Sequence, residues 1–123
     1  MAKKILIADD EATVRDLIRL SLEHEGYEIF EAKNGVEALN KAKELVPDLL
    51  ILDVMMPGKI GYQVCSELKS DPATMRISII FITARDSSLS LEAIQASGGD
   101  GYLSKPFKPQ ELKARIRNVF KAG

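Results

Sequence analysis

The sequence contains one cysteine, one histidine and no tryptophan. The single cysteine, Cys65, excludes an internal disulfide, and its apolar neighbours Val64 and Leu68 on a predicted helix favour an inert core position. The single histidine, His24, falls at the polar end of another predicted helix. Without a second histidine or a second cysteine, the chain offers neither a ligand set for zinc nor a histidine-based catalytic triad.

The sequence also lacks a long apolar run and an excess of charge of one sign. Its formal net charge is -1, so we expect no direct binding to nucleic acid or to an anionic membrane. No run approaches the roughly 20 apolar residues of a membrane-spanning helix. The first apolar run, 5–8, is cut short by Asp9 and Asp10 before a secretory core forms. Together with the lone cysteine, this start predicts a cytoplasmic protein.

The composition is that of an ordinary globular domain. Apolar residues make up 46% of the 123 residues and charged residues 28%, a balance that supports one buried core. No linker, internal repeat or low-complexity segment divides the sequence. We therefore expect a single domain over residues 1–123.

Short apolar runs alternate with segments of helical periodicity along the whole chain. The predicted strands are 5–8, 28–32, 49–52, 77–83 and 102–103. The predicted helices run from Glu11 to a left-handed stop at Gly26, over 36–45 after an Asn34-Gly35 turn, around 64–68, over 89–97, and from Pro109 onward.

Five strand-helix units in strict alternation require helical crossovers, so the strands must be parallel. Their uniformly apolar character requires cover on both faces of the sheet. The sequence thus predicts an α/β fold, a doubly wound sandwich with a five-stranded parallel sheet and five helices.

Polar residues follow four of the five predicted strands. They are Asp9 and Asp10 after the first strand, Asp53 after the third, Thr83 at the end of the fourth, and Lys105 with Pro106 after the fifth. The carboxyl ends of parallel strands meet at one edge of a sheet, where ligands bind in such folds. We therefore expect three carboxylates, a hydroxyl and an ammonium group to converge there.

Three neighbouring carboxylates repel one another unless a cation lies among them. With no imidazole or thiolate nearby, such oxygen ligands favour Mg²⁺, for which Mn²⁺ can substitute. A carboxylate can also act as a nucleophile and form an aspartyl phosphate, a reaction that needs mainly positioning and charge neutralisation. Lys105 and Thr83 supply groups for both tasks.

Each of these residues also has a plain structural explanation. Asp9 and Asp10 can cap the helix that follows them, and Asp53 can belong to a Pro-Gly turn. Thr83 can simply end a strand, and Lys105 can be a solvated surface charge. Their convergence at one edge of the sheet favours the functional interpretation.

The motifs, in this order, resemble the signature of response-regulator receiver domains over the whole chain. The matching segments are Asp9-Asp10, Asp53 with Met56-Pro57-Gly58, Thr83-Ala84 and Lys105-Pro106-Phe107. The resemblance implies a flavodoxin-like sheet with the strand order 2-1-3-4-5. It also implies that the protein is a switch in two-component signal transduction.

The resemblance assigns the acidic residues their roles. Asp53 would be the phosphoacceptor. Asp10, Asp53 and the backbone carbonyl of Met55 would bind the magnesium ion, and Asp9 would act through a metal-bound water.

The resemblance also assigns roles to residues of the fourth and fifth strands. Lys105 would contact the phosphoryl oxygens, and Thr83 would move toward them after phosphorylation. Tyr102 would swing into the space that Thr83 vacates. A cis peptide bond before Pro106 would aim Lys105, since cis bonds are largely confined to proline.

The expected function is a phosphorylation-activated switch fed by a sensor histidine kinase or a phosphotransfer protein. The phosphorylated chain would change the surface formed by 89–97, 102–103 and the last helix, and so control an output protein or a C-terminal effector domain. It would be no enzyme toward other substrates, because it catalyses only its own Mg-dependent phosphorylation and dephosphorylation. It would be a monomer or a phosphorylation-dependent dimer.

Two other functions fit the same predicted fold. One is an interaction module that is never phosphorylated, although such domains typically lose an acid, the acceptor or the lysine. The other is a flavin or nucleotide binder, although Asp9 and Asp10 stand where a phosphate-binding loop is needed.

Several positions depart from the common family pattern. Met55 and Arg85 cannot orient a water as an amide or carboxylate can, which predicts slow self-dephosphorylation. Ile60 and Gly101 stand where acidic residues are common. Gly101 and Leu91 also disfavour a dimer built on charge pairs. The candidates for such pairs are Asp100, Glu111 and Arg115. An exposed Leu91 beside Tyr102 instead predicts a partner-binding patch.

Overall fold

The computed structural model describes residues 2–84 and 91–122. Strands and helices alternate along these residues. The strands are β1 (Lys4–Ala8), β2 (Glu28–Ala32), β3 (Leu49–Asp53), β4 (Ser78–Ala84) and β5 (Gly101–Lys105). The helices are α1 (Ala12–Ser21), α2 (Gly35–Leu45), α3 (Gly61–Lys69), α4 (Leu91–Ser97) and α5 (Pro109–Ala122).

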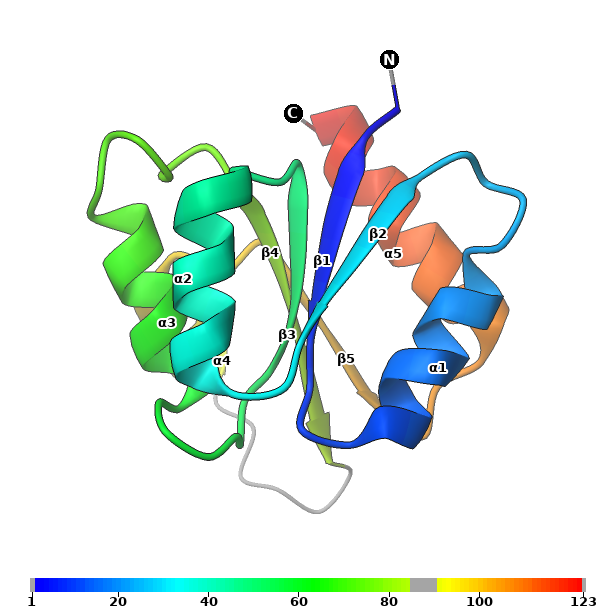
Figure 1. The fold of residues 1–123 in the computed structure, drawn as a ribbon, viewed down its shortest axis with the longest axis horizontal. Helices are drawn as coiled ribbons and strands as arrows, with labels where there is room; N and C mark the ends of the chain where they lie inside the picture. The colour runs from blue at the N-terminus through cyan, green and yellow to red at the C-terminus, as the bar shows by residue number, and fades with distance from the viewer. Residues whose placement is uncertain (1, 85–90, 123) are drawn as a thin grey trace.

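The strands form one parallel sheet with the order β2-β1-β3-β4-β5 (Figure 1). Every connection between strands passes through a helix, as parallel pairing requires. The predicted fold and strand order are confirmed: the chain is a flavodoxin-like α/β sandwich.

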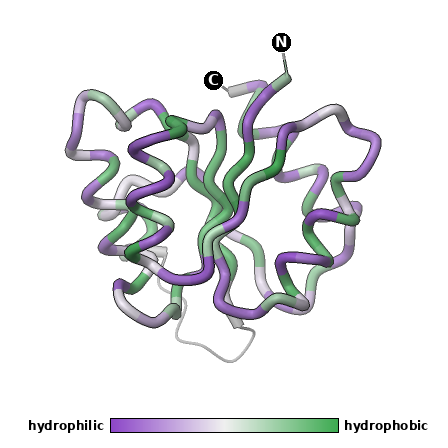
Figure 2. Tube along the Cα trace, viewed as in Figure 1, coloured by the Kyte–Doolittle hydropathy of each residue, from purple (hydrophilic) through white to green (hydrophobic). Residues whose placement is uncertain are grey.

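Helices cover both faces of the sheet. Leu6, Leu50 and Phe81 pack on one side, against apolar residues of α2, α3 and α4. Ile7 and Ile51 pack on the other side, against apolar residues of α1 and α5. Figure 2 shows the apolar strands in the centre and hydrophilic stretches on the outer sides of the helices. The continuous apolar runs of the inner strands follow from this two-sided burial.

Two predicted features around the first two helices are wrong. Helix α1 ends at Ser21, before Gly26, although Gly26 does adopt the expected left-handed conformation, with φ of 82°. Asn34 and Gly35 do not form a separate turn. Asn34 is the N-cap of α2, where its side chain accepts a hydrogen bond from the Glu37 N–H, and Gly35 is the first helical residue.

Other boundaries differ slightly from prediction. Strand β5 is longer than the predicted 102–103, because Gly101, Ser104 and Lys105 also pair with β4. Residues 89–90, predicted to begin the fourth helix, lie outside the described residues. None of the described helices is both long and apolar enough to cross a membrane.

All five strands run in the same direction, so their carboxyl ends lie together along the lower edge of the sheet in Figure 1. The loops after β1, β3 and β5 emerge side by side at this edge. The fold therefore gathers the polar residues that follow these strands.

Candidate functional site

An acidic cluster lies at the carboxyl edge of the sheet. One carboxylate oxygen from each of Asp9, Asp10 and Asp53 lies within 4.8 Å of the other two. Asp9 follows β1 and is fully buried, Asp53 is the last residue of β3 and is buried, and Asp10 is exposed. The predicted convergence of these three side chains is confirmed.

Lys105, the last residue of β5, reaches into this cluster. Its Nζ lies 3.3 Å from Asp53 Oδ2, 2.9 Å from Asp9 Oδ2 and 3.5 Å from Glu11 Oε1. The peptide bond between Lys105 and Pro106 is cis, the geometry expected for it. One ammonium group offsets only one of the three carboxylate charges in the cluster, so the site remains acidic.

The buried Asp9 side chain is only partly satisfied by the protein. Its Oδ1 accepts a hydrogen bond of 2.9 Å from the Glu11 N–H. Its Oδ2 forms an ion pair with Lys105 but has no partner in hydrogen-bond geometry among the described residues. A buried carboxylate oxygen left in this way, in an all-oxygen acidic cluster, fits a hard divalent cation.

The charges of the cluster shift the pKa of two of its residues, Asp53 and Lys105. Burial and the nearby Asp9 charge raise the pKa of Asp53 from its ordinary 3.8 to about 6, against the opposing effect of Lys105. Burial acts to lower the pKa of Lys105, but its contacts with Asp9 and Asp53 outweigh burial and raise it. Ionised Asp53 is therefore unfavourable without additional positive charge.

Backbone groups of the loop after β3 fix the position of Asp53. The Met55 N–H donates a hydrogen bond of 3.2 Å to Asp53 Oδ1, and the Gly61 N–H donates one of 2.7 Å to the Val54 carbonyl. A Cβ at Gly61 would lie 2.6 Å from the Asp53 carbonyl oxygen, so only glycine fits. Met55, two residues after the buried Asp53, is itself 65% exposed.

Thr83 and Tyr102 lie on the neighbouring strands β4 and β5, and Thr83 directly follows Ile82, the ladder partner of Asp53. Thr83 is buried on β4, opposite Ser104 in the ladder. Tyr102 is partly buried against the core beneath α2, α3 and α4, and the Arg115 guanidinium lies 5.7 Å from its ring centre. Side chains alternate along strands, so Thr83 and Tyr102 lie on the same face of the sheet. Their switching roles remain predictions.

Two charged residues proposed for dimer contacts are engaged within the chain. Asp100 pairs with Lys69 at 3.2 Å and accepts a 2.8 Å hydrogen bond from the Ile79 N–H. Glu111 accepts a 3.1 Å hydrogen bond from the Lys108 N–H. The prediction of slow self-dephosphorylation rests in part on Arg85, which lies outside the described part of the structure. The Leu91 side chain lies outside it as well.

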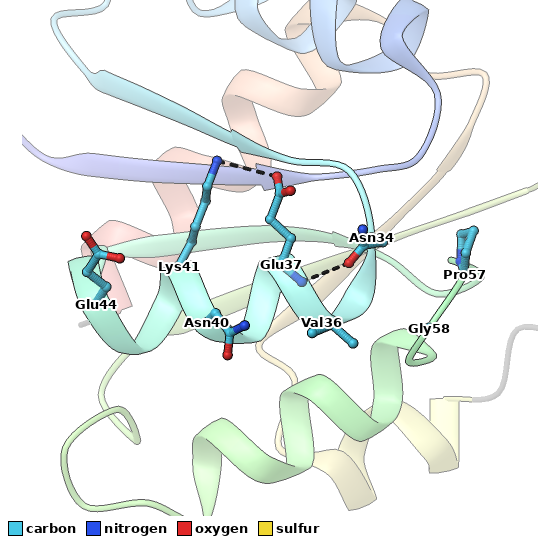
Figure 3. A pocket seen from close by; sticks show the side chains of 8 residues that line it. All are labelled: Asn34, Val36, Glu37, Asn40, Lys41, Glu44, Pro57 and Gly58. Carbon is cyan, nitrogen blue, oxygen red and sulfur yellow. Dashed lines mark hydrogen bonds and ion pairs between the residues drawn. The ribbon is translucent and has the colours of Figure 1, made fainter.

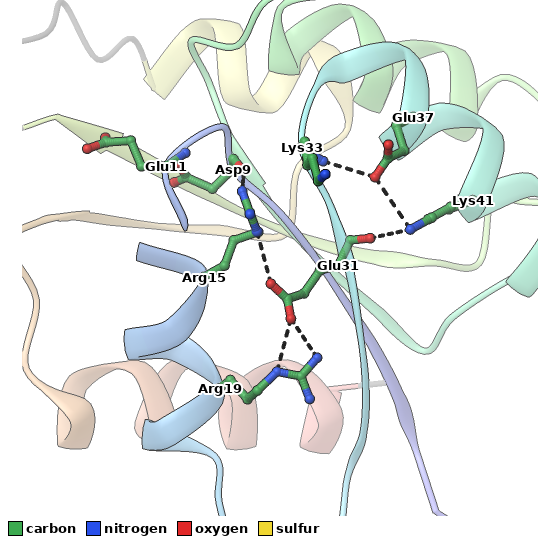
Figure 4. A network of polar contacts seen from close by, with 8 residues as sticks. All are labelled: Asp9, Glu11, Arg15, Arg19, Glu31, Lys33, Glu37 and Lys41. Atoms are coloured by element: carbon green, nitrogen blue, oxygen red, sulfur yellow. Dashed lines mark hydrogen bonds and ion pairs between the residues drawn. The ribbon is translucent and has the colours of Figure 1, made fainter. Parts of the chain in front are cut away.

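Sequence reasoning missed two residues beside the cluster. Glu11 reaches Lys105, and Arg15 donates a hydrogen bond of 2.7 Å to the Asp9 carbonyl (Figure 4). Glu11 directly follows Asp10, and this adjacency was the available signal for it. Nothing in the sequence distinguishes Arg15 from Arg19 on the same helix.

A hollow of about 680 Å³ lies on the outer side of α2, against the loop at Pro57 and Gly58 (Figure 3). Its lining contains no member of the acidic cluster. Three of its polar side chains are partnered within the chain, since Asn34 caps α2 and Lys41 pairs with Glu37 at 3.4 Å. We assign the chemistry to the acidic cluster and not to this hollow.

Comparisons with known proteins agree with this geometry. Residues 5–117 match the family model of the response regulator receiver domain. The chain is 38% identical to the alkaline phosphatase synthesis transcriptional regulatory protein PhoP of Bacillus subtilis, and 40% identical to the phosphate regulon transcriptional regulatory protein PhoB of Pseudomonas aeruginosa. Each alignment covers 98% of this chain but 50% and 53% of those proteins, so the chain spans about half their length.

Solved structures give the same result. A putative response regulator from Chloroflexus aurantiacus superposes with a TM-score of 0.90 at 38% identity, covering 97% of this chain and 98% of that one. The chemotaxis response regulator CheY4 of Vibrio cholerae superposes with a TM-score of 0.89 at 30% identity, covering 97% and 99%. With its sheet order, its acidic cluster and these matches, the chain belongs to the response regulator receiver domain family.

Proposed function

We propose that this chain is a phosphorylation-activated switch that accepts a phosphoryl group on Asp53 in a Mg²⁺-dependent reaction. The observation that carries the proposal is the grouping of Asp53 with Asp9, Asp10 and Lys105 at the carboxyl edge of the sheet. Such a grouping has no purpose in the core of the fold, because burying like charges together is destabilising.

In the proposed reaction, an Asp53 carboxylate oxygen forms a bond to the phosphorus atom of the donor. The bond between phosphorus and the leaving group breaks, and the leaving group takes that electron pair. The Met55 N–H fixes the carboxylate through Oδ1, and Lys105, 3.3 Å from Oδ2, supplies positive charge next to the incoming phosphoryl oxygens. Positioning and charge neutralisation are the main requirements of phosphoryl transfer.

Asp10, Asp53 and the backbone carbonyl of Met55 would hold the magnesium ion, with Asp9 contributing through a water. When bound, the ion neutralises charge on the carboxylates and on the phosphoryl group. The fit is supported by Asp9 Oδ2, which is ion-paired with Lys105 but lacks a hydrogen-bond partner among the described residues, and by the all-oxygen ligand set. Mn²⁺ would substitute, because it accepts the same oxygen ligands.

The switch would work through Thr83 and Tyr102. A phosphoryl group adds about −1.5 to −2 charges at one edge of the sheet, which favours movement of the Thr83 hydroxyl toward it. Tyr102 shares that face of the sheet and would follow into the vacated space. The changed surface would be that of α4, β5 and α5.

The partners follow from the same proposal. We infer that a sensor histidine kinase or a phosphotransfer protein supplies the phosphoryl group in the cytoplasm, and that an output protein or a C-terminal effector domain reads the switch. The chain would turn over no external substrate and would bind no nucleic acid itself, consistent with its net charge of -1. Its relatives PhoP and PhoB are named as transcriptional regulatory proteins and are about twice its length.

Mass spectrometry of the intact protein tests the proposal. After incubation with a small-molecule phosphodonor and Mg²⁺, we expect the chain to gain the mass of one HPO₃ group. Chelation of the metal or the substitution Asp53→Asn should abolish the gain. An unchanged mass in the presence of Mg²⁺ would instead support an interaction module that is never phosphorylated.

A further inference from the structure

We propose that Arg15 is a positioning residue for the metal site, because it fixes the peptide that joins Asp9 to Asp10. This inference rests on the metal site proposed above. Arg15 would touch neither the metal nor the phosphoryl group.

The contact is made to the main chain of the acidic pair. Arg15 Nη1 donates a hydrogen bond of 2.7 Å to the carbonyl oxygen of Asp9. This carbonyl belongs to the peptide unit that also contains the Asp10 nitrogen, and a peptide unit is planar. Holding its oxygen therefore sets the direction in which the chain enters Asp10.

The sheet does not fix this peptide by itself. Strand β1 ends at Ala8, and the Asp9 N–H donates a hydrogen bond to the Ala32 carbonyl on β2 at 3.2 Å. The Asp9 carbonyl accepts instead from the Arg15 guanidinium. The Asp9 side chain is held separately, by the Glu11 N–H.

Arg15 is itself held in place by Glu31 on β2. Its Nε donates to Glu31 Oε1 at 2.9 Å, and only 11% of its side chain is exposed. Arg19 donates to the other oxygen, Glu31 Oε2, at 2.7 Å. Figure 4 shows Glu31 between the two arginines, with Arg15 directed toward Asp9. The planar guanidinium presents its donors in a fixed fork, and so serves both partners at once.

Arg19 provides a matched comparison within the same network. It shares the Glu31 carboxylate, to which its Nε and Nη2 donate at 3.0 and 2.7 Å, but its side chain is 47% exposed. Both arginines thus tie α1 to β2, and Arg15 alone of the two extends the network to Asp9. A role in stability is common to both, whereas a role in the metal site belongs to Arg15.

Direct Mn²⁺ binding to the whole chain tests the proposal, with free Mn²⁺ measured by electron paramagnetic resonance. Removal of a residue that orients metal ligands typically weakens metal binding by about 10- to 100-fold, and we expect a loss of this size for Arg15→Met. Arg19→Met should bind Mn²⁺ as the wild type does. Arg15→Lys, which retains the charge but not the forked donor geometry, should lie between the wild type and Arg15→Met and guards against a loss of fold.

Unfolding of the metal-free proteins by urea provides the second measurement. Arg15→Met and Arg19→Met each remove one ion pair with Glu31, so similar losses of stability with different Mn²⁺ affinities would support the positioning role. Equal weakening of Mn²⁺ binding in both variants, or wild-type binding by Arg15→Met, would overturn that role alone. A wild-type chain that does not bind Mn²⁺ would overturn the metal site, and the positioning role with it.

Discussion

At the scale of single residues, the environment of Asp53 disfavours the ionised form of its carboxyl group. It is buried next to the fully buried Asp9, and its pKa is raised to about 6. An aspartate in such a place reduces the stability of the metal-free protein whenever it is ionised. The fold therefore accommodates this acid at a cost in stability.

This conflict predicts that Asp53→Asn stabilises the metal-free protein in a pH-dependent way. The folded-state pKa of about 6 lies above the ordinary 3.8, so the cost of ionisation is absent below pH 3.8 and complete above pH 6. The stability gained by the variant should grow between these pH values and then level off at about 1–3 kcal/mol. Urea unfolding in the presence of a chelator measures it.

The control is Asp16→Asn, which changes an exposed aspartate of α1 to the same amide. We expect its effect on stability to be small and flat across the same pH range. A constant difference between wild type and Asp53→Asn from pH 4 to pH 8 would contradict the raised pKa.

At the scale of elements, the N-terminus of α2 and the loop after β3 support each other. Asn34 caps α2, and the Gly35 N–H donates a hydrogen bond of 3.1 Å to the Pro57 carbonyl in the loop. A Cβ at Gly35 would collide with the backbone of Lys59. The helix start and the loop that follows Asp53 therefore form one packed unit.

The cap predicts a measurable loss of stability on Asn34→Ala. The Asn34 side-chain oxygen accepts from the Glu37 N–H at 2.8 Å, and Glu37 accepts in return from the Lys33 N–H at 3.1 Å. Removal of such an N-cap costs about 1 kcal/mol. Asn40→Ala, an exposed change of the same kind on α2, should be neutral or slightly stabilising because alanine favours helix. Equal effects of the two changes on the urea midpoint would argue against the cap.

The loop itself predicts a cost for Gly61→Ala. The added methyl group would lie 2.6 Å from the Asp53 carbonyl oxygen, so the backbone behind the site must move. Overpacking of this kind typically costs about 1–3 kcal/mol. Gly101→Ala is the matched control, because its Cβ would meet only Ile80, at an ordinary 3.8 Å. Thermal unfolding of the two variants compares these costs, and a Gly61→Ala protein as stable as Gly101→Ala would contradict the close approach.

At the scale of the whole molecule, the sequence predicted the architecture better than the details. The apolar runs of β1, β3 and β4 are unambiguous because these strands are buried on both faces, and their polar ends then place the acidic cluster by topology alone. The Asn34-Gly35 pair was misread because the same dipeptide suits a turn and a helix start. Contact with the loop after β3 decides between the two.

The contacts of long side chains were the part that sequence reasoning could not supply. Lys105 lies nearer to Asp9 than to Asp53, and Arg15 reaches Asp9 while Arg19 does not. Such contacts depend on distances across the sheet edge, which no local pattern encodes. The length of strand β5 was underestimated for a related reason. Pairing with β4 extends the strand to Gly101 and Ser104 despite their weak strand propensity.

The metal site predicts a stability effect for the molecule as a whole. A ligand that binds only the folded state stabilises it by about 2.7 kcal/mol when its free concentration is a hundredfold above the dissociation constant. For a domain of this size, saturating Mg²⁺ should then raise the melting temperature by about 10 °C. The rise should be reversed by chelation and largely lost in Asp10→Asn, whereas Asp16→Asn should retain it. Because the ion would neutralise the cluster that destabilises the metal-free fold, a melting temperature unaffected by Mg²⁺ would mean that the three carboxylates do not form a cation site.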